Sequence, residues 1–135
     1  MDQALLVDYL NAVYRKLDEQ YGPVHLLMLL ALVPGIKDYW NLVVSAAGFD
    51  QDTRVTAIGK VVDLLPKKMP KAVRSSIGRV SVLRTDDPFV QGMNKVKRRN
   101  QMFAEEDPAL HLEDTRVSGI EIPEAIVLLE QPKAA

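Results

Sequence analysis

Four aspartates follow two apolar segments of the chain and have the chemistry to bind a metal ion. Asp50 and Asp52 come after one segment, and Asp86 and Asp87 come after the next. If the two segments are parallel strands of one sheet, these residues lie at the edge where open sheets tend to bind ligands. Hard cations such as Mg²⁺ prefer carboxylate oxygens. The aspartates therefore define one hypothesis, a metal-dependent hydrolase or nuclease.

The same aspartates also lie where helix N-caps belong. Asp50 or Asp52 precedes a helical pattern, and Asp87 is followed by Pro88, a residue suited to the first helical position. Capping therefore explains all of them except Asp86. We favour capping over catalysis, and we assign no metal site and no cofactor.

Other catalytic arrangements are missing from the sequence. The chain contains no cysteine, which excludes disulfides, thiol nucleophiles and iron–sulfur clusters. His25 and His111 are far apart and show no metal-ligand spacing. The seven glycines are scattered and form no phosphate-binding loop, and no serine lies in a nucleophile elbow. An enzyme is therefore not the favoured interpretation.

The charges are segregated along the chain although the net charge is only −1. Residues 60–99 contain eleven bases and three acids, whereas residues 100–135 contain two bases and eight acids. A basic segment of this kind predicts a nucleic-acid or acidic-partner surface. Only one aromatic residue, Phe89, is available there for stacking on bases, so we favour a solvated or self-paired surface. The basic candidates are Lys67, Lys68, Lys71, Arg74, Lys95, Lys97, Arg98 and Arg99.

The first half of the chain predicts a helix and a hairpin. Apolar residues recur at helical spacing over 3–20, and Gly22 and Pro23 end that helix. Residues 24–33 are apolar apart from His25, and we favour a buried strand over a helix because the run is short. A turn then leads to a strand over 40–46, in which Trp40 is expected to pack in the core.

The second half predicts two further helices and further strands. They are a helix over 50–65, a basic connector over 67–78, a strand over 79–85 and a helix over 87–98. Residues 99–115 show no period and predict a mobile acidic loop. Residues 117–129 predict one bent strand or two strands, with Pro123 at a bulge or edge, and 131–135 a frayed tail.

These elements predict one α+β domain over residues 1–135. Its mixed sheet has four to five strands, an antiparallel hairpin followed by β-α-β-α-β, and it has three main helices. Met1, Asp2 and Gln3 lack the basic residues of a secretory signal, and no apolar run is long enough to cross a membrane, so we expect a cytoplasmic protein.

For function, the sequence favours a non-enzymatic interaction or regulatory module that forms a homodimer. Residues 125–129 are continuously apolar and would need covering at a sheet edge. The basic and acidic parts of the chain also offer complementary surfaces for a second copy.

Overall fold

The computed structural model describes residues 2–104 and 106–129, so the expected tail over 131–135 lies outside the described residues. This part of the chain forms an α+β domain with a mixed sheet. Its elements follow in chain order: α1 (Gln3–Tyr21), β1 (Val24–Ala31), β2 (Trp40–Ala46), η1 (Ala47–Phe49), α2 (Arg54–Lys68), α3 (Lys71–Arg74), β3 (Ile77–Val82), α4 (Pro88–Asn100), η2 (Gln101–Phe103), β4 (Ala109–Val117) and β5 (Ile120–Leu128).

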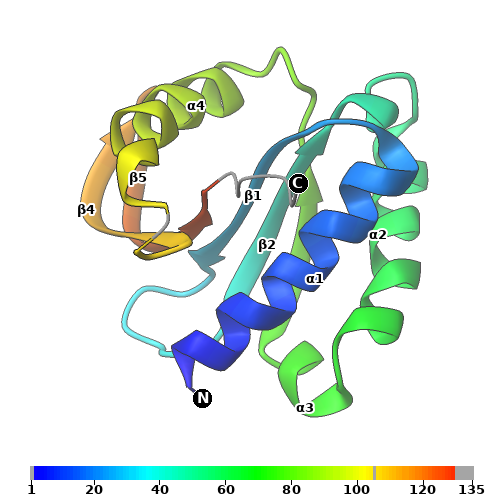
Figure 1. Cartoon of the computed structure of the whole chain (residues 1–135), viewed down its shortest axis with the longest axis horizontal. Helices are drawn as coiled ribbons and strands as arrows, with labels where there is room; N and C mark the ends of the chain where they lie inside the picture. The colour runs from blue at the N-terminus through cyan, green and yellow to red at the C-terminus, as the bar shows by residue number, and fades with distance from the viewer. Residues whose placement is uncertain (1, 105, 130–135) are drawn as a thin grey trace.

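The sheet has the strand order β3-β2-β1-β5-β4, with β3 and β4 at its two edges (Figure 1). β1 pairs antiparallel with β2 and with β5, β4 pairs antiparallel with β5, and β2 pairs parallel with β3. The predicted hairpin and the first crossover are therefore confirmed. The second predicted crossover is wrong, because α4 takes the chain to the far side of the sheet, where β4 and β5 form an antiparallel hairpin.

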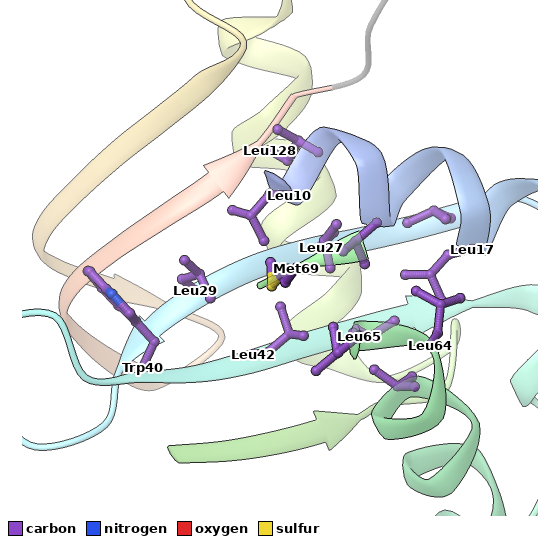
Figure 2. Close-up of a cluster of buried hydrophobic side chains, with 14 of the residues drawn as sticks. Leu10, Leu17, Leu27, Leu29, Trp40, Leu42, Leu64, Leu65, Met69 and Leu128 are labelled. Carbon is purple, nitrogen blue, oxygen red and sulfur yellow. The ribbon is translucent and has the colours of Figure 1, made fainter. Parts of the chain in front are cut away.

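Helices cover both faces of the sheet, with α1 and α2 on one face and α4 on the other (Figure 1). Figure 2 shows the core of the first face, where leucines of α1, α2, β1 and β2 point toward one another. Trp40 joins this core and is 1% exposed, as predicted. A second core lies beneath α4 and includes Phe89, Val90 and Met93.

The strand β1 is apolar apart from His25 because both of its faces are covered. Leu27 and Leu29 belong to the core beneath α1 and α2, whereas Leu26 and Met28 belong to the core beneath α4. A strand buried on both faces has no polar side to display, so its sequence does not alternate. The strand interpretation of residues 24–33 is confirmed.

The prediction of a mobile loop over 99–115 is wrong, because residues 109–117 form the strand β4. Apolar side chains such as Leu110 and Leu112 lie partly buried against the core beneath α4, and they alternate with exposed polar ones. The exposed side chains of this edge strand are polar. Its two consecutive acidic residues, Glu113 and Asp114, hide the alternation of apolar and polar residues in the sequence. Residues 120–128 form a single strand, and the pairing register omits Pro123, which has no amide hydrogen to donate.

The expectation that residues 125–129 lie at a sheet edge is also wrong. Ala125, Ile126 and Val127 pair with β1 on one side and with β4 on the other. Their apolar character is explained by burial in the middle of the sheet. None of the helices in the described part of the chain is both long and apolar enough to cross a bilayer.

Candidate functional site

Asp50 holds together two turns that are far apart in the sequence. Its carboxylate accepts hydrogen bonds from the backbone N–H of Thr85 at 2.9 Å and from the Thr85 hydroxyl at 2.5 Å. Its carbonyl oxygen accepts from the Arg84 guanidinium at 2.9 Å. The expected capping of α2 by Asp50 or Asp52 is wrong, because Thr53 is the N-cap and accepts from the backbone N–H of Thr56.

The other three aspartates also have partners within the protein. Asp52 pairs with Lys60 at 2.8 Å. Asp87 caps α4, as predicted, by accepting from the backbone N–H of Phe89 at 2.8 Å. Asp86 is exposed and pairs with Arg84 at 3.1 Å, and this hydrogen-bonded ion pair lowers the pKa of the Asp86 carboxyl.

These contacts give each aspartate a structural role. Over residues 2–104 and 106–129, no group of three or more histidine, aspartate or glutamate side chains is arranged to hold a metal ion. The hypothesis of a metal-dependent hydrolase or nuclease gains no support from the positions of Asp50, Asp52, Asp86 and Asp87.

The basic residues of the middle segment fall into two groups on opposite faces of the sheet. Lys67, Lys68, Lys71 and Arg74 lie at the end of α2 and in α3, whereas Lys95, Lys97, Arg98 and Arg99 lie in α4. α2 and α3 pack on one face of the sheet and α4 packs on the other, so the sheet separates the two groups. A nucleic-acid strand tracking the whole segment would have to pass around the sheet.

Lys97 differs from the other basic candidates because it is buried, with 3% of its surface exposed. Its ammonium donates to the carbonyl oxygen of His25 at 2.9 Å and to the side-chain oxygen of Asn94 at 3.4 Å. The lysine therefore fastens α4 to the first residues of β1. The sequence pattern did not indicate this role, since β1 and α4 are brought together only by the fold.

The two edges of the sheet carry opposite charge. Residues 67–82 contain five bases and no acid; four of these bases lie at the end of α2 and in α3, and Arg79 lies on the edge strand β3 itself. Residues 109–128, which include the edge strand β4 and its neighbour β5, contain four acids and one base. We call these the basic edge (residues 67–82) and the acidic edge (residues 109–128). They lie at opposite ends of the sheet (Figure 1).

Two carboxylates of the acidic edge lie directly across from each other. Glu113 of β4 is the register partner of Glu124 of β5. Like charges at directly opposed positions are destabilising, and a cation brought to this edge would relieve the repulsion. Arg116 of the same edge is engaged elsewhere, since it pairs with Glu121 at 2.6 Å.

A cleft between α4 and the first residues of β1 is lined by polar and basic side chains and by no acidic residue. It brings His25 together with Asn94 and Arg98 of α4. No motif in the sequence could have revealed it, because the two segments are distant in the chain and neither has a distinctive spacing. No family model, curated protein or solved structure matches this chain.

Proposed function

We propose that this chain is a non-enzymatic interaction module that self-associates head to tail, the basic edge of one copy docking on the acidic edge of another. The single observation that carries the proposal is the opposite charge of the two segments that include the edge strands of the sheet. The proposal includes a cytoplasmic location, because the sequence contains no cysteine and a reducing compartment needs none.

The backbone at both edges is available for strand addition. β3 pairs with β2 alone and β4 pairs with β5 alone among the described strands, so each has one unpaired side. An unpaired strand edge is a template for pairing with another chain. The side chains along each edge then determine which edge of another copy can pair with it.

The charges select unlike edges over like edges. Two basic edges would bring Arg79 of each copy toward the other, and two acidic edges would do the same for Glu113. Like charges across an edge repel, whereas a basic edge against an acidic edge places Arg79 near the crowded Glu113 and Glu124. The contact is therefore heterologous, and a homodimer of this type leaves one edge open on each copy.

Two charge-reversed variants test the proposal directly. Arg79→Glu removes a cation from the basic edge and leaves the acidic edge intact, whereas Glu113→Lys does the opposite. We expect the wild type to associate at micromolar concentration and low salt, and each variant alone to associate more weakly. An equimolar mixture of the two should associate again, into species of at least twice the 15.1 kDa chain mass, because each edge of one variant meets an edge of opposite charge on the other.

Light scattering and analytical ultracentrifugation measure these masses. Lys95→Glu serves as the control, since Lys95 is exposed on α4 and belongs to neither edge. Raising the salt to about 1 M, where the screening length is only about 3 Å, should dissociate the wild type. A wild type that is monomeric at low salt, or a mixture of the two variants that stays monomeric, would refute the proposal.

A further inference from the structure

The cleft between α4 and the first residues of β1 has the size of a small-molecule site. Its volume is ≈ 420 Å³, and small-molecule pockets are typically about 300–1,000 Å³. Pro23 and Val24 supply its apolar lining. Its remaining lining residues are all polar or basic: His25, Gln91, Asn94, Lys97, Arg98 and Gln101.

Hydrogen bonds within the wall fix the position of the donors. Lys97 donates to the side-chain oxygen of Asn94, so the amide N–H groups of Asn94 are the part of that side chain left to donate. Lys97 also donates to the carbonyl oxygen of His25, which holds the start of β1 against α4. Gln91 is fixed by donating to the carbonyl oxygen of Thr85 at 2.7 Å. The cleft is thus shaped before any ligand enters.

Arg98 supplies a charged donor at this cleft. Its side chain is exposed, and it forms no ion pair with any residue in the described ranges. A guanidinium is planar and matches the geometry of phosphate oxygens, to which it can donate two parallel hydrogen bonds. His25 and Asn94 line the same cleft, and their side chains are of types that can donate an N–H to an anion.

We propose that this cleft binds the phosphate group of a small phosphorylated molecule, with Arg98, Asn94 and His25 as donors. The absence of any acidic residue from its lining favours an anion. Its volume of ≈ 420 Å³ is of the size that holds a small ester. No residue that lines the cleft belongs to the basic edge or to the acidic edge, so this proposal does not depend on self-association.

Titrations of the full chain, followed by amide NMR shifts, test the site. The probes are inorganic phosphate, ribose 5-phosphate and adenosine 5′-monophosphate, with ribose and adenosine as their phosphate-free counterparts, all at constant ionic strength. We expect the phosphate esters to shift the amides of His25, Asn94 and Arg98, and the phosphate-free compounds to leave them unchanged. Comparison of the two esters shows whether the base adds affinity.

Arg98→Gln and Arg99→Gln form a matched pair, because both remove one exposed cation from the last turn of α4 and only Arg98 lines the cleft. Losing a charge-assisted hydrogen bond should weaken ester binding about 10- to 100-fold in Arg98→Gln. Arg99→Gln should stay within about twofold, since screened surface charges contribute little.

Three results would overturn the proposal. They are the absence of shifts at millimolar ester, binding of inorganic phosphate with no binding of either ester, and equal losses in the two variants. Stronger binding of an oligonucleotide than of the monoesters, reduced alike in both variants, would instead assign the exposed cations of α4 to a nucleic-acid backbone. The wild-type shift map alone decides the site if Arg98→Gln does not fold.

Discussion

Removing the Asp50 carboxylate should destabilise the protein more than removing any of the other three aspartates. Asp50 is the one that joins distant segments, since its carboxylate accepts from both the backbone N–H and the hydroxyl of Thr85. Asp50→Ala therefore removes two of the three hydrogen bonds that join the turn before α4 to the end of η1, and leaves the bond from Arg84 to the backbone carbonyl. Asp50→Asn keeps one acceptor oxygen and should have an intermediate effect.

The expected loss follows from these two hydrogen bonds. A hydrogen bond to a charged group contributes about 1.5–3 kcal/mol. Asp50 is half-buried and both donors belong to one residue, so we take a combined loss near the lower limit, about 2–3 kcal/mol. With an unfolding entropy of about 2.1 cal/mol/K per residue, this loss lowers the Tm by about 7–11 °C.

Chemical denaturation and calorimetry of the variants measure the loss. Asp87→Ala, which removes an N-cap, should cost about 0.5–2 kcal/mol, and Asp86→Ala, which removes only an exposed ion pair, should cost less than either. A double-mutant cycle of Asp50→Ala with Thr85→Val should give a coupling of about 1 kcal/mol. Equal stabilities of Asp50→Ala and Asp86→Ala would show that the reasoning is wrong.

Two further predictions concern glycines and pH. Gly59→Ala in α2 should raise the free energy of unfolding by about 0.5–1 kcal/mol, because no heavy atom lies within 4 Å of the added Cβ. Gly48→Ala should lower it by about 1–3 kcal/mol, because that Cβ would lie 2.3 Å from the carbonyl oxygen of Tyr21; denaturation curves that order the two variants the other way would contradict both. NMR titration should find the pKa of Asp86 below its usual value and restored in Arg84→Gln. Because this pKa is lowered on folding, the contribution of the pair is present above about pH 4 and disappears as the pH falls through the folded-state pKa; an Asp86 pKa that Arg84→Gln leaves unchanged would contradict the assignment.

The helix ends and the central strands were predictable because their signals are local. Asp87 and Pro88 mark the start of α4 through a capping bond that spans two residues. Gly22 follows α1 with a φ of 78°, a conformation that glycine adopts readily. The apolar run of β1 reflects burial on both faces. In each case the residues that form the signal lie within the element or beside it.

The strand β4 could not be separated from a loop by its sequence alone. One edge of β4 has no partner among the described strands, and its exposed residues include Glu113 and Asp114. What makes this segment a strand is the backbone of β5, which supplies a hydrogen-bonding partner along most of its length. An edge strand has only one such partner, so its own amino-acid sequence carries only a weak strand signal.

By itself, the sequence determined the fold class, the buried strand β1, the N-cap of α4 and the lack of a recognisable catalytic motif. The tertiary structure decided the order of the strands, and with it the placement of the basic and acidic edges at opposite ends of the sheet. It also decided that Lys97 is buried against His25 and that Asp50 is bound to Thr85. Caps and periodicity arise from interactions within a few residues, whereas these features arise between segments whose encounter depends on how the whole chain packs.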